Sequence, residues 1–179
     1  MARGESVNVE KYLEVLQFLL ASGANNCHLG KVKLMKLLYF ADFDHYYRHG
    51  SSITGDAYVK LEYGPVPKCG QAMIDELRHR GQLDVDQEPV YEYFRNVYRL
   101  KHEPAPMGRL DANEVSTLAD VVNKWSNHTR EDIVTASHGD PPWIMTDYGG
   151  EILYDLVFYR NNLVDNRDEE PEIATQDVV

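Results

Sequence analysis

Two segments in the first 50 residues carry hydrophobic side chains at the spacing of an α-helix. Residues 8–22 place Val, Tyr and Leu side chains on one face, and Gly23 follows as a stop signal. Residues 30–49 are apolar around most of their circumference. Their narrow polar strip consists of Lys33, Lys36, Asp44 and Tyr47, with Phe40 set into it. This pattern predicts a central helix that other elements wrap on most sides and that ends at Gly50.

The hydrophobic period changes to two residues after Asp56. Apolar and polar side chains alternate over residues 57–63, which is typical of a β-strand. Gly64 and Pro65 are expected to end this strand, because proline has no N–H to offer a β-ladder. A second strand is predicted within residues 90–100, which are rich in Tyr, Phe and Val, and it could pair with the first.

Helix signals return in the rest of the chain. Asp111 with Glu114, and Thr129 with Asp132, have the spacing of a capping box at a helix N-terminus. The predicted helices are 66–80, 111–126, 129–139 and 150–160, with a turn at 141–143. Together these elements predict a mainly α (α+β) fold: a compact helical domain around a central buried helix, with a small antiparallel β element.

Length and charge limit the possible functions. The 179 residues suit one domain with a real core. The net charge of -11 disfavours broad nucleic-acid binding, because the chain repels phosphate backbones. We expect an N-terminal extension at 1–8, one folded domain at 9–164 and an acidic, disordered tail at 165–179. A solubilising role for this tail is favoured over two alternatives, docking on a basic partner and providing a handle for a protease.

Cysteine usage and hydropathy add two expectations. Cys27 and Cys69 are the only cysteines and have no zinc-site spacing, so we expect reduced thiols and no cofactor. The N-terminus has no apolar run of the signal-peptide type, and no stretch approaches the ~18 apolar residues of a membrane span. A cytoplasmic protein is expected.

Four short motifs occur in order along the chain. They are K-L-x-K-L-L-Y-F-A-D at 33–42, G-x-x-I-x-G-D-x-Y at 50–58, Tyr-Gly-Pro-Val-Pro at 63–67 and S-H-G-D-P-P-W at 137–143. Through them the chain resembles the Panacea domain, the SocA-like antitoxin domain, over roughly residues 9–160. Ser137 stands where the T-H-x-x-x-P-W signature of this family has Thr. The resemblance implies a protein of bacteria or their phages, commonly encoded beside a toxin gene, that neutralises its toxin by direct protein contact without catalysis.

The resemblance and the aromatic content together suggest the partner-binding positions. We expect exposed parts of these side chains and turns to contact the toxin: Tyr39, Asp42, Tyr46, Tyr47, Tyr63, Gly64, Pro65, His138 and Trp143. Purely structural roles compete with this interpretation at three of them. Gly64 suits a sharp turn, Trp143 suits a core anchor, and a charged His138 suits the C-terminus of the preceding helix.

Other classes of function remain as alternatives. The chain could be a phage or prophage factor that binds a host protein. A less favoured alternative is a metal-dependent hydrolase using His45, His49 and His138, with Asp42. A site of paired carboxylates built from Asp42, Asp44 and Asp56 is disfavoured, because Asp42 and Asp44 point apart on a helix, and solvated or capping roles are expected. The basic residues Lys31, Lys33, Lys36 and Arg48 are interpreted as an ordinary solvated face.

Overall fold

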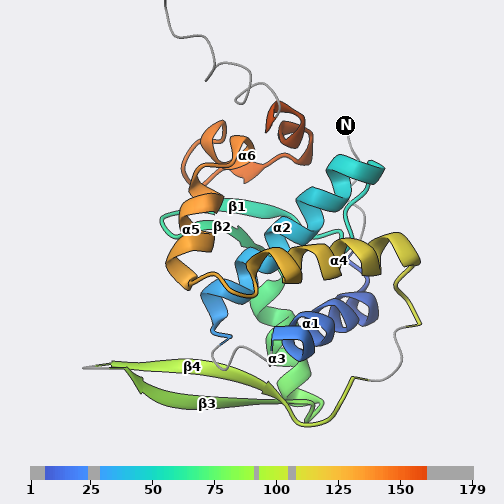
Figure 1. Ribbon diagram of the computed structural model, residues 1–179, viewed down its shortest axis with the longest axis vertical. Helices are drawn as coiled ribbons and strands as arrows, with labels where there is room; N and C mark the ends of the chain where they lie inside the picture. Colours follow the sequence, from blue (N-terminus) through green and yellow to red (C-terminus); the bar gives the residue numbers. More distant parts are fainter. Residues whose placement is uncertain (1–6, 24–28, 91–92, 105–107, 161–179) are drawn as a thin grey trace, which may run out of the picture.

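Helix α2 (Lys31–His49) crosses the centre of the molecule, as predicted (Figure 1). The computed structural model describes residues 7–23, 29–90, 93–104 and 108–160, so the expected acidic tail and most of the N-terminal extension lie outside the described residues. Gly50 ends the helix in the left-handed conformation (φ 76°), and its N–H donates to the carbonyl oxygen of Tyr46. Glycine adopts this conformation without steric cost, which explains the sharp stop.

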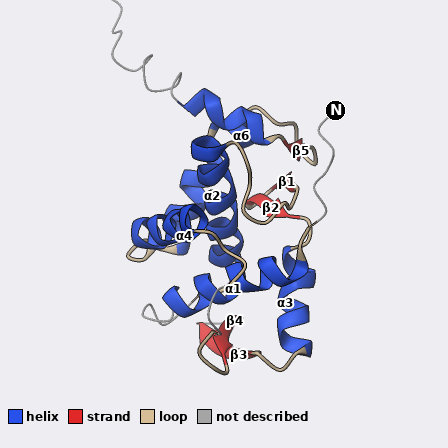
Figure 2. Cartoon of the chain, turned by 90° about the vertical axis from the view of Figure 1, so that its right-hand side faces the viewer, coloured by secondary structure: helices blue, strands red, loops and turns tan. Residues whose placement is uncertain are grey.

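Other helices surround α2. α1 (Val9–Gly23), α4 (Ala112–Trp125) and α5 (Arg130–His138) all pack against it. Both predicted capping boxes are present, at Asp111 with Glu114 and at Thr129 with Asp132. Figure 2 shows α4 on one side of α2 and a small sheet on the other. The mainly α fold with small antiparallel β elements is therefore confirmed.

The small sheet has the strand order β2-β1-β5 and is antiparallel throughout. Its strands are β1 (Tyr58–Leu61), β2 (Gly64–Pro67) and β5 (Glu151–Ile152). The prediction that the chain enters a helix at residue 66 was wrong, because residues 64–67 return along β1 as a hairpin and α3 begins only at Gly70 (Gly70–His79). β2 tolerates its two prolines because it is an edge strand.

A second, two-stranded ribbon lies at the other end of the molecule (Figure 1). It pairs β3 (Leu83–Val90) with β4 (Tyr93–Leu100), so the expected pairing of residues 90–100 with the first strand was wrong. β3 carries acidic residues at alternate positions, and these pair with basic residues of β4, for example Asp86 with Arg99 at 3.2 Å. The apolar face of β3 consists of Leu83 and Val85, which pack on the core, and the rest of the strand is polar or carries cross-strand ion pairs, so the hydrophobic pattern is short and easily missed.

The C-terminal part differs from the prediction in its local structure. Pro141–Ile144 form a short helix, α6, where a turn was expected. The predicted helix at 150–160 is instead strand β5 followed by the 3-10 helix η1 (Tyr154–Arg160). Ile152 pairs with Tyr58 of β1, so the backbone there bonds to the sheet and cannot begin a helix. No helix in the described ranges combines the length and the apolarity that crossing a membrane requires.

Candidate partner-binding site

Three of the four sequence motifs meet at Gly64, at the start of β2. Gly64 has φ +92°, and a Cβ atom at this position would lie 2.7 Å from Oγ of Ser137 and 3.0 Å from Nζ of Lys36. Such distances are too short for any side chain, so glycine is required for the close approach of β2 to α2 and α5. The hairpin is thereby held against residues that are distant in the sequence.

Lys36 is buried at this junction, with 1% of its surface exposed. Its Nζ donates a hydrogen bond of 2.7 Å to the carbonyl oxygen of Pro65. Burial, with a smaller contribution from the charge of Arg130, lowers the pKa of Lys36 to about 7. The interpretation of Lys36 as part of a solvated basic face was therefore wrong, because the α2–β2 contact covers it.

His138 and Trp143 stack beside this junction. Their ring centroids are 4.4 Å apart with an interplanar angle of 21°, and Nζ of Lys60 lies 4.0 Å from the centroid of the Trp143 ring. Burial, followed by the charges of Lys36 and Lys60, lowers the pKa of His138 and so disfavours its charged form. His138 lies in the last turn of α5, as expected, but its lowered pKa weakens the case for a charged ring at this helix end. Trp143 is half-buried and packs against the core, as an anchor would.

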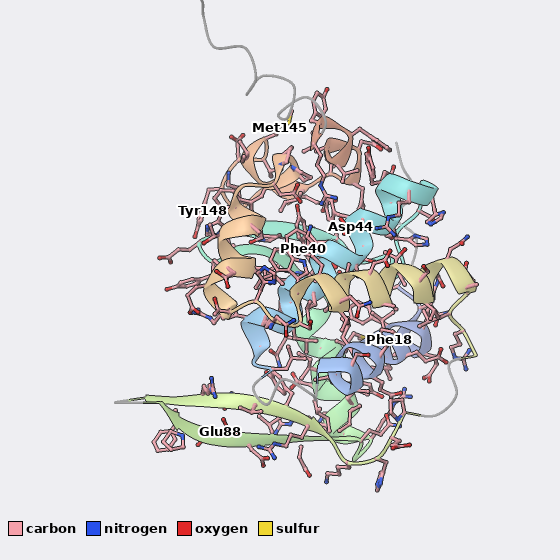
Figure 3. All side chains as sticks on the ribbon, viewed as in Figure 1. Phe18, Phe40, Asp44, Glu88, Met145 and Tyr148 are labelled. Carbon is pink, nitrogen blue, oxygen red and sulfur yellow. The ribbon has the colours of Figure 1, made fainter. Side chains whose placement is uncertain are left out.

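Exposed aromatic side chains lie on the two segments that adjoin Lys60. Tyr63, in the turn between β1 and β2, is 59% exposed, and Tyr148 is 71% exposed at the outer edge of the fold (Figure 3). Backbone hydrogen bonds join Lys60 to Gly149 and Gly150, which keeps the two tyrosine-bearing segments together. We call this region the hairpin surface and define it by Lys60, Leu61, Tyr63, His138, Trp143 and Tyr148.

Tyr39 and Asp42 lie in the core and have no exposed surface, so the expectation of exposed parts at these two positions was wrong. Asp42 accepts hydrogen bonds from the backbone N–H of Ile53 (2.9 Å) and Thr54 (2.8 Å) and from the hydroxyl of Tyr58 (2.7 Å). Burial raises the pKa of Asp42. Its role is to fix the loop after α2, because it satisfies several buried donors at once.

The other two carboxylates of interest also serve internal contacts. Asp56 is buried and accepts from the hydroxyl of Tyr12 (2.9 Å) and the backbone N–H of Cys69 (3.0 Å). Asp44 pairs with Arg160 at 2.6 Å. The expected solvated or capping roles were therefore wrong, since these bonds join separate segments of the chain.

Tyr46 and Tyr47 face the 3-10 helix η1. The Tyr46 ring stacks on Tyr154 with centroids 5.1 Å apart, and its hydroxyl donates to Asp155 at 2.6 Å. Tyr47 is partly exposed and lies 5.8 Å from the Phe158 ring. Of the predicted positions, Tyr63, Gly64, Pro65, His138 and Trp143 come together, whereas these two tyrosines belong to a different surface.

The histidines of the hydrolase alternative occupy two separate places. Nδ1 of His45 donates to the carbonyl oxygen of Ser51 at 2.7 Å, and the rings of His45 and His49 are 4.6 Å apart. His138 stacks on Trp143 instead. Within the described part of the chain, no three His, Cys, Asp or Glu side chains are grouped so that they could hold a metal ion.

The family model of the antitoxin SocA-like Panacea domain matches residues 34–144, which is more than half of the chain. The chain therefore belongs to this family. No curated protein and no solved structure shows significant similarity to it. The matched region contains the hairpin surface except Tyr148, and it ends before η1.

Three members of the hairpin surface, Lys60, Leu61 and Tyr148, were not among the predicted positions. Lys60 and Tyr148 lie far apart in the sequence, and neither belongs to a motif that marks it. The alternation in β1 was visible, but only the folded chain brings Lys60 to Trp143 and to the segment of Tyr148.

Proposed function

We propose that this protein is an antitoxin that neutralises a toxin protein by direct contact through the hairpin surface. The observation that carries the proposal is the convergence of three motifs of an antitoxin family at one place that exposes aromatic side chains. Tyr and Trp are enriched among the residues that dominate binding energy at protein interfaces, where they combine a large apolar area with a polar group.

The proposed mode of action is occlusion. The antitoxin covers the active or target-binding surface of the toxin in the bacterial cytoplasm, and none of its own residues has a catalytic role. The net charge of -11 makes a protein partner far more suitable than a nucleic acid. Family membership also supports a protein partner.

Growth rescue tests this proposal. The open reading frame beside this gene is expressed alone and together with the full chain, and bacterial growth is followed. We expect growth arrest that co-expression relieves. The double variant Tyr63→Ala, Tyr148→Ala should lose the rescue, because it removes the most exposed aromatic area of the hairpin surface.

Phe94 provides the matched control. It is 68% exposed on β4, in the ribbon away from the hairpin surface, so Phe94→Ala should rescue growth as well as the wild type does. Full rescue by a folded double variant would overturn the choice of surface. A harmless neighbouring gene product would overturn the pairing of toxin and antitoxin at this locus.

A further inference from the structure

The hairpin surface contains one lysine, Lys60, that forms no ion pair with a described carboxylate. Most Lys and Arg side chains in the described ranges form ion pairs, for example Lys68 with Glu151 and Arg48 with Asp120. Lys60 forms none with a described carboxylate, although the chain carries a net charge of -11. Burial is the main cause of the lowered pKa of His138, and the charge of Lys60 contributes to it after that of Lys36.

The position of Lys60 distinguishes it from an ordinary surface lysine. Its ammonium group lies over the ring of Trp143, and Lys60 as a whole is half-buried on β1, between segments that carry the exposed Tyr63 and Tyr148. An aromatic face holds an ammonium group in place but does not neutralise its charge. A charge that is already held in place binds an opposite charge with a smaller loss of side-chain freedom than a mobile one does.

We propose that the hairpin surface binds a carboxylate of the partner protein, an Asp or Glu side chain flanked by apolar residues, through the ammonium group of Lys60. This inference rests on the proposed function and specifies what the toxin presents. The carboxylate pairs with Lys60 over Trp143, while the flanking apolar residues cover Tyr63 and Tyr148. The arrangement is that of an interface hot spot, in which a central anchor is surrounded by contacts that exclude water.

A pair of blocked peptides tests the inference without the toxin. Acetyl-Leu-Glu-Leu-amide and acetyl-Leu-Gln-Leu-amide are titrated into the full chain at constant ionic strength, and the indole N–H signals are followed by NMR. The chain has two tryptophans, and Trp125 serves as an internal reference because it also has a lysine, Lys124, near its ring (5.2 Å). We expect a saturating shift at Trp143 with the Glu peptide, and at least about tenfold weaker binding of the Gln peptide.

One variant tests the role of Lys60 in peptide binding, and a second serves as its control. Lys60→Gln should weaken binding of the Glu peptide about tenfold, whereas Lys31→Gln, at an exposed position at the start of α2, should leave it unchanged. Equal shifts at both tryptophans, or equal binding by Lys60→Gln, would overturn the inference. Saturation by inorganic phosphate in the absence of any Glu-peptide binding would also overturn it, since a phosphate would then be the preferred anion.

The result of the peptide titration can be distinguished from the result of the growth-rescue experiment. Growth rescue without a saturating shift at Trp143 leaves toxin neutralisation intact and overturns the carboxylate contact. A saturating shift that Lys60→Gln weakens, in a protein that rescues nothing, supports the anion site and overturns the antitoxin role at this locus.

Discussion

Lys36 should make the stability of this protein depend on pH in a way that one substitution removes. The side chain is buried, and its pKa in the folded chain is about 7 against an ordinary value of 10.5. Below pH 7, Lys36 is protonated in both the folded and the unfolded chain, so the folded state bears the full cost of a buried charge. Above pH 7 the unfolded chain binds more protons than the folded chain, and the free energy of unfolding rises with pH.

The size of the effect follows from the two pKa values. The difference between the two pKa values of Lys36 corresponds to about 5 kcal/mol in the free energy of unfolding over the whole pH range of its titration. Between pH 6 and pH 9, linkage with these values gives a gain of about 2.5 kcal/mol in the free energy of unfolding. This is a large fraction of the stability of a single domain, so it is readily measured.

Urea unfolding at pH 6, 7.5 and 9 measures the effect in the wild type and in Lys36→Met. The methionine has a similar length and no charge, so the difference between the two proteins should increase by about 2.5 kcal/mol in favour of the wild type from pH 6 to pH 9. Lys31→Met is the matched control, because Lys31 is exposed on the same helix. A constant difference between wild type and Lys36→Met across this range would refute the assignment of a buried lysine with a lowered pKa.

Three further substitutions test the packing around α2 by urea unfolding. Gly64→Ala should lower the free energy of unfolding by more than 2 kcal/mol. The control Gly81→Ala, with φ +69° and no atom within 4 Å of the added Cβ, should lower it by only about 1 kcal/mol. Equal losses would argue against the close contact of Gly64 with Ser137 and Lys36. Arg160→Met should cost about 3 kcal/mol because Asp140 loses its bidentate partner, and a result below 1 kcal/mol would contradict this. Asp42→Ala should cost about 3 kcal/mol or more by leaving several buried donors unpaired; a near-neutral result would refute that role.

The parts of the fold that the sequence predicts well are those with local signals. The apolar circumference of α2, the glycine at residue 50 and the capping boxes at Asp111 and Thr129 each act within a few residues, and all appear in the structure. Strand pairing depends on contacts between distant segments. The partner of β4 was therefore missed, because the apolar alternation of β3 is limited to Leu83 and Val85. The 3-10 helix η1 and strand β5 likewise form where one helix was predicted.

Burial of polar residues was the main source of error at the candidate site. Helical periodicity gives the direction of the Asp42 and Lys36 side chains around the helix axis. It does not show that the hydroxyl of Tyr58 donates to Asp42, or that Lys36 donates to the carbonyl oxygen of Pro65. Gly64 and Pro65 marked this segment as special, but they lie in strand β2 after the turn and not in a turn that leads into a helix. The contribution of Lys60 depends on a ring contact with Trp143 that no local pattern reveals.

The most direct test of the central claim is whether a stable complex accompanies neutralisation. Tagged full-length protein is co-expressed with the product of the neighbouring gene, growth is recorded, and the purified protein is analysed by size-exclusion chromatography. The account predicts restored growth together with a complex of the two proteins, both lost in the double variant Tyr63→Ala, Tyr148→Ala. Restored growth with no complex at micromolar concentration would contradict it, because neutralisation would then not depend on direct contact.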